Sequence, residues 1–474
     1  MNQTQKINST FIVIITVFFF WGFVAASNGI LIPLFKAKFH LSQFQSQWVD
    51  SAFYMAYAVG SLIYFGLSVK IGDPLNKIGY KKGLVAGLLL SAIGALLFIP
   101  AANLNSYAFL LLALFVIGLG FALQQIVANP FVANFGDKAH GAHRLSLAGG
   151  INSFGTTIGP VLLSIALFGS VTAPKPETMG IEAVKVPAMI LFGLFILCAA
   201  LIQFSKLPKI EETEGEGSDK FKITQYPQLI LGMIGIFLYV GVEVSIQSNM
   251  GALLEMPSIK GIDHTKIAPF ISLYWGSLMI GRWTGAISVF NLSKTGKLIA
   301  QIAVPLVAFV VVFLVNDINK YDTSDFISYL PYVFIAIFLF IISGEDASKT
   351  LLYLASAASI MMIVGLFTTG NVALLSFMSG GLFCSVMWPC IFSLAIGGLG
   401  KHTNQGSSLL IMMILGGAIV PPLQGYIADH YNAHSSYIVT VFCFAYLAWF
   451  AFKVKRIYAA KNIVLTETAV KSGH

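Results

Sequence analysis

Hydrophobic stretches of about twenty residues recur along the whole chain, separated by short polar loops. A helix of about twenty residues crosses a hydrocarbon core of roughly 30 Å, so each stretch is long enough to span a membrane. The pattern predicts an all-α polytopic membrane protein with fourteen spans. These predicted spans are residues 11–34, 47–71, 83–101, 106–131, 145–169, 187–205, 228–254, 267–290, 297–315, 326–343, 350–367, 372–397, 406–428 and 437–452.

The composition excludes a soluble globular protein. Of the 474 residues, 57% are hydrophobic and only 10% are charged, whereas soluble domains carry about 25% charged residues. The four cysteines, Cys198, Cys384, Cys390 and Cys443, all fall inside apolar stretches. Their spacing implies neither a disulfide framework nor a metal site, and we expect no cofactor.

The net charge of +8 reflects membrane topology rather than a nucleic-acid partner. If the N-terminus is cytoplasmic, twenty lysines and arginines lie in inside segments and seven in outside segments. Positive residues accumulate on the cytoplasmic side of membrane proteins. We therefore expect a multi-pass protein of the bacterial inner (cytoplasmic) membrane with both termini in the cytoplasm.

An acidic linker divides the predicted spans into two groups. Residues 206–227 contain the run EETEGEGSD, which is too polar to pack. The linker separates an N-terminal six-helix half, residues 1–205, from a C-terminal half, residues 228–474, with eight predicted spans. We interpret it as a solvated tether, with a regulatory surface as the alternative.

A weak internal repeat relates the two halves. Ser146–Pro160 (SLAGGINSFGTTIGP) and Ser408–Pro422 (SLLIMMILGGAIVPP) share Ser, Leu, Gly and Pro at the same offsets. The first is the fifth span of its half and the second is the seventh, so two spans are extra. We assign them to a transmembrane hairpin at about residues 295–345. Two related six-helix halves around a midplane site are typical of the major facilitator fold.

The loop between the second and third spans carries GDPLNKIGYKK, from Gly72 to Lys82. It resembles the loop signature of the major facilitator superfamily, with Asn76 where an aspartate is usual. A tight glycine turn with nearby charges can lock the inner ends of the helices in one state. This predicts a gating role for Asn76, Lys77 and Gly79. An ordinary positively charged inside loop is the alternative.

A second Gly-Arg element lies at the predicted inner end of span eight, in the sequence GRWTG that starts at Gly281. Its position corresponds to that of the first, so we group Arg282 with the gating residues. An arginine at a helix end can also snorkel to the membrane interface and pair with the C-termini of helices, which is a structural role.

Five further segments carry a more specific resemblance. They are Gln125–Val132 (QIVANPFV), Asn152–Gly155 (NSFG), Tyr239–Glu243 (YVGVE), Ile391–Ala395 (IFSLA) and Gly416–Pro422 (GGAIVPP). Together they resemble the fucose:proton symporter family, including its glucose/galactose transporter branch. The similarity covers most of the chain and implies a sugar carrier driven by protons.

The sequence departs from this family where coupling is concerned. The fucose member has carboxylates in its first and fourth helices, and the matching positions here are Gly29 and Gln125. Glucose/galactose members resemble this chain in having glutamine at the second position. The resemblance therefore favours that branch but leaves the proton carrier unassigned.

Two acidic residues lie well inside predicted spans. Asp50 lies in the first turn of span two, where the helix macrodipole stabilises an acid by about 0.3–1 kcal/mol, so a structural cap is the alternative to a coupling role. Glu243 lies near the centre of span seven, where a charged acid costs on the order of 2.5 kcal/mol or more. We expect Glu243 to carry the coupling proton. A protonated side chain bonded between helices is the alternative.

Sugar recognition requires uncharged hydrogen-bonding groups and an aromatic face. Glu243 and Gln247 are four residues apart and share one helical face. With Asn152 and Gln125 from the other half, they form the expected binding site. Other amides crosslink helices in any bundle. The expected substrate-binding residues are Asn28, Gln124, Gln125, Asn129, Asn152, Gln247, Asn249, Trp275 and Trp388.

These features predict a secondary active transporter that imports glucose, galactose or a related hexose by alternating access. We expect proton coupling, with a sodium-coupled symporter or a facilitative carrier as the alternatives. An enzyme is excluded because the longest loop, about twenty residues, is acidic and offers no metal set or paired catalytic groups. The expected partners are the sugar, H⁺ or Na⁺ and the lipid bilayer, without nucleic acid, and the expected state is a monomer.

Overall fold

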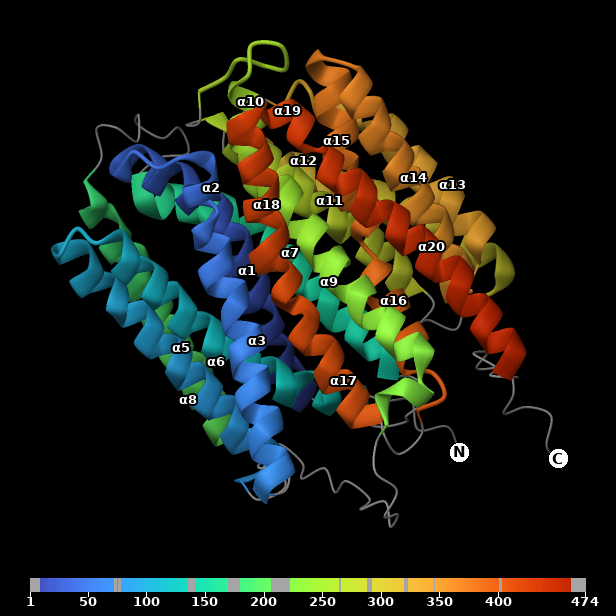
Figure 1. Cartoon of the computed structure of the whole chain (residues 1–474), viewed down its shortest axis with the longest axis horizontal. Helices are drawn as coiled ribbons and strands as arrows, with labels where there is room; N and C mark the ends of the chain where they lie inside the picture. The colour runs from blue at the N-terminus through green and yellow to red at the C-terminus, as the bar shows by residue number, and fades with distance from the viewer. Residues whose placement is uncertain are drawn as a thin grey trace.

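The computed structural model describes residues 9–71, 75, 78–134, 141–168, 180–205, 222–263, 266–287, 292–318, 323–344, 346–399 and 403–461. Within these ranges, all regular structure is helical (Figure 1). The N-terminal bundle contains α1 (Ser9–Phe39), α2 (Gln43–Ser46), α3 (Trp48–Ile71), α5 (Tyr80–Asn103), α6 (Tyr107–Asn134), α7 (Gly141–Phe168) and α8 (Lys185–Phe204). The C-terminal bundle contains α9 (Pro227–Ser248), α10 (Met250–Glu255), α11 (Ala268–Ala286), α12 (Lys294–Ile318), α13 (Leu330–Ser343), α14 (Ala347–Phe367), α15 (Gly370–Cys384), α16 (Met387–Ile396), α17 (Thr403–Met412), α18 (Gly416–His430), α19 (Ala433–Ser436) and α20 (Ile438–Lys461).

The helices coincide with the apolar stretches. A helix lies in each of the fourteen predicted segments, and eight of the described helices are long and apolar enough to cross a membrane. The pair α15 and α16 is bent by 42° at its break and adds a ninth if it forms one span. The all-helical, polytopic architecture is therefore confirmed, while the count of fourteen spans stays a prediction.

Close helix pairs hold the N-terminal bundle together. α1 packs along α7, α3 along α6, and α5 along both α6 and α8. A Cβ added to Gly22 of α1 would lie 2.0 Å from the Asn152 carbonyl oxygen of α7, and one added to Gly155 of α7 would lie 2.2 Å from the Phe19 carbonyl oxygen. Small residues allow membrane helices to approach this closely. The backbones of α1 and α7 are therefore in direct contact.

The C-terminal bundle packs in a comparable way and meets the N-terminal bundle along two seams. α9 packs against α18 and α20, and α14 packs against α15 and α20. The seams are formed by α7 with α11 and by α3 with α18. At the second seam, the Ser51 hydroxyl donates to the Ala418 carbonyl oxygen at 2.8 Å, and the Tyr54 ring lies against Gly417. Polar groups of one bundle thus meet the backbone of the other.

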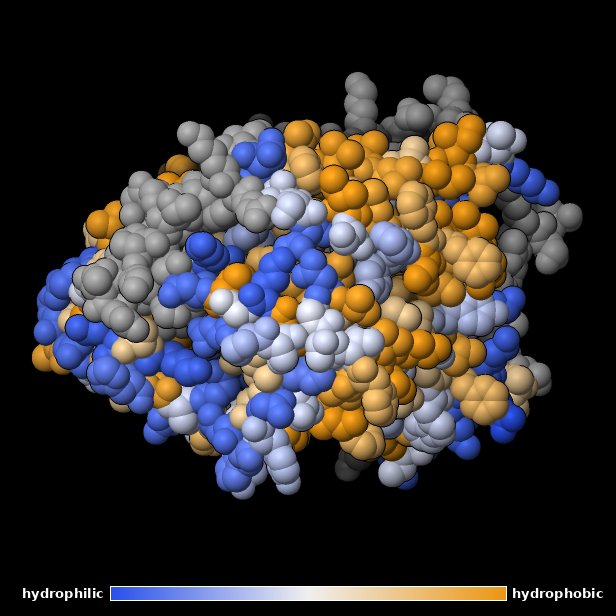
Figure 2. Space-filling model, turned by 90° about the horizontal axis from the view of Figure 1, so that it is seen from above, coloured by the Kyte–Doolittle hydropathy of each residue, from blue (hydrophilic) through white to orange (hydrophobic). Residues whose placement is uncertain are grey.

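Of the two helices of the expected hairpin, α13 lies at the edge of the C-terminal bundle (Figure 1), and α12 packs against α11 and α13. Only 22% of the most apolar stretch of α12 is buried within the protein. Hydrophobic residues are more frequent on the right-hand half of the view in Figure 2, the side on which α13 and α14 lie in Figure 1. Exposed apolar side chains of the two helices include Leu298, Ile299, Val307, Val310, Phe334 and Phe338. Such a surface suits contact with lipid.

Polar contacts anchor the hairpin near the turn between α12 and α13. The buried Asn316 amide donates to the Ser272 hydroxyl of α11 at 3.0 Å. Asp325 forms an ion pair with Lys260 and accepts a hydrogen bond from the Asn371 amide at 2.7 Å. The hairpin is therefore attached to α11, to the segment before α11 and to α15.

Deleting the hairpin by joining Lys294 to Ser348 is expected to lower stability more than it alters ligand selectivity. The deletion uncovers the apolar face of α11 and removes the bond from Asn316 to Ser272. The test compares the thermal unfolding midpoint in detergent with the pattern of competition among sugars. Asn316→Ala is the milder companion, with an expected cost of about 1–3 kcal/mol. Changed selectivity in a well-folded deletion would instead place the hairpin at the binding site.

Candidate functional site

Glu243 and Arg282 form a buried ion pair. Glu243 lies near the middle of the apolar segment Pro227–Glu255, and Arg282 lies on α11. Their side chains are 11% and 16% exposed, and Arg282 Nη2 lies 3.1 Å from Glu243 Oε1. Removing one partner of a buried pair leaves an uncompensated charge and costs about 3–5 kcal/mol. Each of the two charges therefore depends on the other.

The Arg282 guanidinium also reaches the N-terminal bundle. Its Nη1 donates to Asn152 Oδ1 at 3.1 Å and to Ser153 Oγ at 2.9 Å, both on α7. Its Nε donates to the Ser385 carbonyl oxygen, directly after α15, at 3.2 Å. A guanidinium holds five donors in a rigid planar fork, so one side chain can join several elements. The expected pairing with a helix C-terminus is present at Ser385, but the side chain points inward instead of snorkelling to the interface.

Two tyrosines complete the hydrogen bonding of Glu243. The Tyr239 hydroxyl donates to Glu243 Oε1 at 2.7 Å, and the Tyr274 hydroxyl donates to the Glu243 carbonyl oxygen at 2.6 Å. On the other side of the seam, the Asn152 amide donates to the Phe18 carbonyl oxygen of α1 at 2.8 Å. We call Glu243, Arg282, Asn152, Ser153, Tyr239 and Tyr274 the polar cluster.

Asp50 belongs to a second buried group that crosses between the bundles. Fully buried in the first turn of α3, it accepts a hydrogen bond from the Ser248 hydroxyl of α9. Ser248 lies five residues beyond Glu243, about 7.5 Å along the helix. The Gln247 amide donates to the same hydroxyl at 3.1 Å, and the Gln47 amide donates to the Ser248 carbonyl oxygen at 3.4 Å. Asp50 thus lies in the first turn of α3, as predicted, and its carboxylate links α3 to α9.

The short helix α2 ties the bundles together at one end (Figure 1). The Gln43 amide donates to Asn249 Oδ1 at 3.1 Å. The Asp429 carboxylate of α18 accepts hydrogen bonds from the backbone N–H groups of Gln43 and Phe44, at 3.0 Å and 2.8 Å. Asn249 therefore uses its amide oxygen in this tie, and its role in substrate binding stays a prediction.

The glutamines of α6 bond within the N-terminal bundle. Gln124 is fully buried, accepts a hydrogen bond from Trp21 Nε1 at 2.9 Å and donates to Ser91 Oγ at 2.9 Å. These bonds crosslink α1, α5 and α6, a common use of amides in membrane bundles. The half-buried Gln125 donates to the Tyr57 hydroxyl at 3.2 Å. The structure does not join Gln125 to the polar cluster.

The remaining predicted residues of the N-terminal bundle are described only in part. Asn129 is half-buried on α6. The side chain of Asn28, and residues Asn76 and Lys77, lie outside the described residues. Gly79 directly precedes α5 with a φ of 81°, a left-handed conformation that favours glycine. Gly79 therefore has a conformation that suits glycine, while the tight turn and its gating role stay predictions.

Three buried polar atoms close to the polar cluster lack a hydrogen-bond partner: Gln247 Oε1, Trp275 Nε1 and Ser385 Oγ. Gln247 lies one turn beyond Glu243, and Trp275 is adjacent to Tyr274. An unpaired buried polar group costs about 1–3 kcal/mol. A ligand with both donor and acceptor groups can satisfy such atoms.

An aromatic side chain borders the polar cluster. The half-buried Trp388 ring has its centroid 6.0 Å from that of Tyr239 and stacks on Phe392 at 6.3 Å. The predicted residues Glu243, Asn152, Arg282 and Trp388 therefore lie in one region of the structure.

The sequence patterns do not single out Tyr274, Ser248 or Ser385, and they include Ser153 only as part of the segment Asn152–Gly155. Serine is frequent in apolar helices and carries little weight in a hydropathy window, so it gives no clear signal. The available signal is adjacency, because Ser153 follows Asn152 and Ser248 lies between Gln247 and Asn249. Tyr274 lies eight residues before Arg282, about two helical turns, so the two share a helix face.

Two helical bundles joined along seams, with a buried ion pair bonded across one of them, define a polytopic membrane transporter. The chain belongs to the Major Facilitator Superfamily, whose family model matches residues 10–345. The expected family is therefore confirmed.

Curated relatives cover nearly the whole chain. The chain is 35% identical to a glucose/galactose transporter of Brucella abortus (strain 2308), over 91% of each chain. It is 29% identical to a putative glucose/galactose transporter of Helicobacter pylori (strain J99), over 92% of this chain and 94% of that one. It is 27% identical to the L-fucose-proton symporter of Escherichia coli (strain K12), over 95% of this chain and 94% of that one.

A solved structure shares the fold. The crystal structure of the transporter FucP in the outward conformation matches with a TM-score of 0.65 and 26% sequence identity, covering 94% of this chain and 98% of that one. This similarity supports the major facilitator fold as the architecture of the chain.

Proposed function

We propose that the protein imports a hexose by alternating access and couples this import to protons through Glu243. The observation that carries the proposal is the bonding of Arg282. Its guanidinium holds Glu243 within the C-terminal bundle and also Asn152 and Ser153 of the N-terminal bundle. A change of charge at Glu243 therefore acts directly on a contact between the bundles. The curated relatives, which include glucose/galactose transporters and an L-fucose-proton symporter, support sugar and proton as substrates.

The coupling step is the arrival of a proton at Glu243. Protonation removes the charge that pairs with Arg282, while Tyr239 can still bond to the neutral carboxyl group. The guanidinium then loses its charged partner and redistributes its hydrogen bonds among Asn152, Ser153 and the Ser385 carbonyl oxygen. Two states of the seam with different bonds to one arginine are what a ligand needs in order to shift a conformational equilibrium.

Sugar recognition is assigned to the region between Glu243 and Trp388. The unpaired atoms Gln247 Oε1, Trp275 Nε1 and Ser385 Oγ provide both an acceptor and donors, as hydroxyl groups require. The Trp388 ring supplies an aromatic surface for the apolar face of a sugar. Asn152 joins this region to the N-terminal bundle, so a sugar bound here contacts both.

Sodium coupling is the second candidate, and the surroundings of Asp50 favour it. Two buried amide oxygens, Gln47 Oε1 and Gln247 Oε1, have no hydrogen-bond partner. Both amides bond to Ser248, whose hydroxyl donates to the Asp50 carboxylate. Carboxylate, amide and carbonyl oxygens are the ligands that hard cations prefer. A facilitative carrier without coupling remains the third.

The proposal includes the finer topology. We propose fourteen spans, as two six-helix halves (residues 1–205 and 228–474) joined by the linker 206–227, with the hairpin at about 295–345. Both termini lie in the cytoplasm of a bacterial cell, and the protein works as a monomer in the inner membrane. The twenty-to-seven distribution of positive residues supports this orientation.

Uptake of labelled glucose, galactose, mannose, fucose and N-acetylglucosamine, by cells overexpressing the protein, tests the proposal. We expect accumulation of glucose or galactose that a protonophore abolishes in sodium-free buffer. Accumulation that requires sodium and survives the protonophore would move the coupling site to Asp50. Equilibration without accumulation would indicate a facilitative carrier, and no uptake of any sugar would contradict the proposed substrate class.

A further inference from the structure

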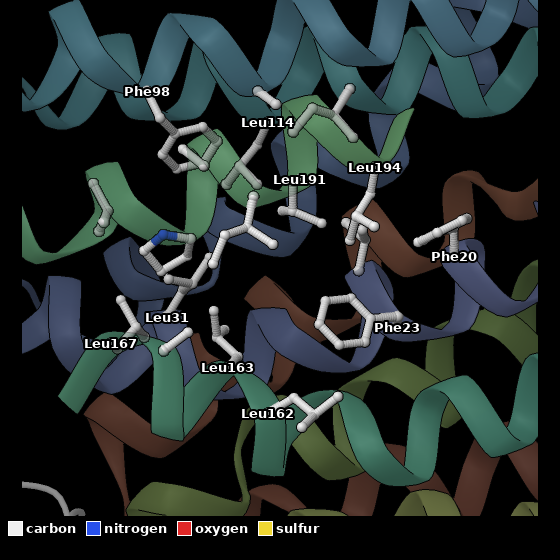
Figure 3. Close-up of a pocket in the computed structure, with 18 of the residues that line it drawn as sticks. Phe20, Phe23, Leu31, Phe98, Leu114, Leu162, Leu163, Leu167, Leu191 and Leu194 are labelled. Atoms are coloured by element: carbon white, nitrogen blue, oxygen red, sulfur yellow. The ribbon is translucent and has the colours of Figure 1, made fainter. Parts of the chain in front are cut away.

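An apolar cavity lies inside the N-terminal bundle, away from the polar cluster. It has a volume of about 270 Å³ and is lined by residues of α1, α5, α6, α7 and α8 (Figure 3). The side chains of Phe23, Leu31, Leu163, Leu191 and Leu194 line it. All the residues that line it are apolar, so the cavity offers no partner for water or for a sugar hydroxyl.

The cavity opens onto the surface that the protein presents to lipid. Leu162 of α7 and Ile190 of α8 belong to its lining and are 46% and 50% exposed. The segment Ile181–Phe204, which contains α8, is long and apolar enough to span a membrane, and only 33% of its most apolar stretch is buried. Its side chains Val186 and Leu197, outside the cavity, are exposed as well. The cavity is therefore continuous with the lipid-facing interface of the bundle.

We propose that this cavity is a binding site for one acyl chain of a membrane lipid. An apolar cavity of about 150 Å³ stays dry and binds benzene, so a larger apolar space next to the bilayer can accept a flexible hydrocarbon chain. Filling the space restores the dispersion contacts that the lining residues lack. The bilayer supplies acyl chains at high local concentration at the mouth of the cavity.

The cavity lies against α1, the helix whose backbone binds the Asn152 side chain. Phe19 and Phe23 line the cavity, and on the same helix the Phe18 carbonyl oxygen accepts the Asn152 amide hydrogen bond. Gly22 lies directly against the Asn152 backbone. An acyl chain between α1 and α8 therefore presses on α1 from the side opposite the polar cluster. Occupancy of the cavity by an acyl chain is therefore expected to change the rate of transport.

The test uses a phosphatidylglycerol with a photoreactive group near the end of one acyl chain, reconstituted with the full-length protein. After irradiation, peptides are mapped for adducts. We expect adducts on the lining residues Leu163, Leu191 and Leu194. In Ala166→Phe, which fills the cavity from α7, these adducts are expected to fall about tenfold. Leu194→Phe, which fills it from α8, provides a second variant should the first fold poorly.

Gly193→Phe is the matched control, because Gly193 lies on α8 with open space around it and does not line the cavity. Its lining adducts should equal those of the wild type, as should adducts on the exposed Phe334 of α13 in every variant. Lining adducts that persist in both filled variants would overturn the proposal. So would labelling of the lining no stronger than that of Phe334, which indicates ordinary lipid contact. The binding test needs no transport and stands apart from the proposed function.

Discussion

Glu243→Gln is expected to abolish accumulation of sugar driven by a pH gradient while sparing energy-independent exchange. Glutamine keeps the shape of the side chain and can still accept the Tyr239 hydroxyl, but it cannot take up or release a proton. The accumulation ratio should therefore fall to about 1, because sugar binding is no longer linked to protonation. Proteoliposomes with an imposed pH gradient measure accumulation, and counterflow of labelled sugar measures exchange.

Asp50→Asn is the companion variant, since Asp50 is the other acid well inside the predicted spans and bonds to Ser248, five residues beyond Glu243 on α9. Its bond to Ser248 can be kept by the asparagine oxygen, so we expect a milder defect in accumulation. The reverse pattern, in which Glu243→Gln still accumulates sugar and Asp50→Asn does not, would identify Asp50 as the carrier. Glu243 would then only hold the sugar or the helices.

Arg282→Gln is expected to produce the second large effect, a loss of transport together with a loss of stability of about 3–5 kcal/mol. The change leaves the Glu243 carboxylate buried without its cation and removes the bonds to Asn152 and Ser153. Arg282→Lys should restore little, because one ammonium cannot reproduce the planar fork that reaches α9, α7 and α15. Initial uptake rates and thermal unfolding midpoints in detergent provide the two measurements.

The double variant Arg282→Gln with Glu243→Gln separates charge from packing. Because it removes both charges together, it should recover most of the stability lost in Arg282→Gln alone, as expected for coupled neighbours. Its accumulation should remain absent. A double variant that is as unstable as the sum of the two single variants would indicate that the pair contributes nothing to stability.

The helices could be predicted because hydropathy acts locally. A window such as 83–101 must be helical in lipid, since its backbone groups find no other partners there, and α5 covers that window. The broken spans were less accessible to this argument. Residues 372–397 form one apolar stretch, but the chain bends between α15 and α16, and a hydropathy average does not register a bend.

The direction of Arg282 could not be predicted from its position in the sequence. Near a helix end, an arginine can reach water or turn inward, and the choice depends on what the neighbouring helices present. Here α7 presents Asn152 and Ser153 and α9 presents Glu243. Along the chain, Asn152 and Ser153 are 130 and 129 positions from Arg282, and Glu243 is 39 positions from it. Only the packing of α11 against both helices brings them within reach.

Amide side chains were the weakest predictors of the site. Asn152 and Gln124 carry the same amide group, and both lie in apolar helices. Asn152 accepts a hydrogen bond from Arg282 of the C-terminal bundle, whereas Gln124 bonds to Trp21 and Ser91 within its own bundle. Which face of a helix meets a neighbouring bundle depends on the tertiary arrangement. A single sequence does not contain that information for residues with few competing charges.

The backbone contact between α1 and α7 has a mechanical consequence. With Gly22 against Asn152 and Gly155 against Phe19, neither helix can slide or roll without a collision of main-chain atoms. We therefore expect α1 and α7 to move as one rigid unit. Relative movement during the transport cycle should then occur mainly at the two seams between the bundles. Distances from α1 and α7 to helices of the C-terminal bundle should therefore report how the two bundles move relative to each other. The helix pair is a suitable reference for following the transport cycle.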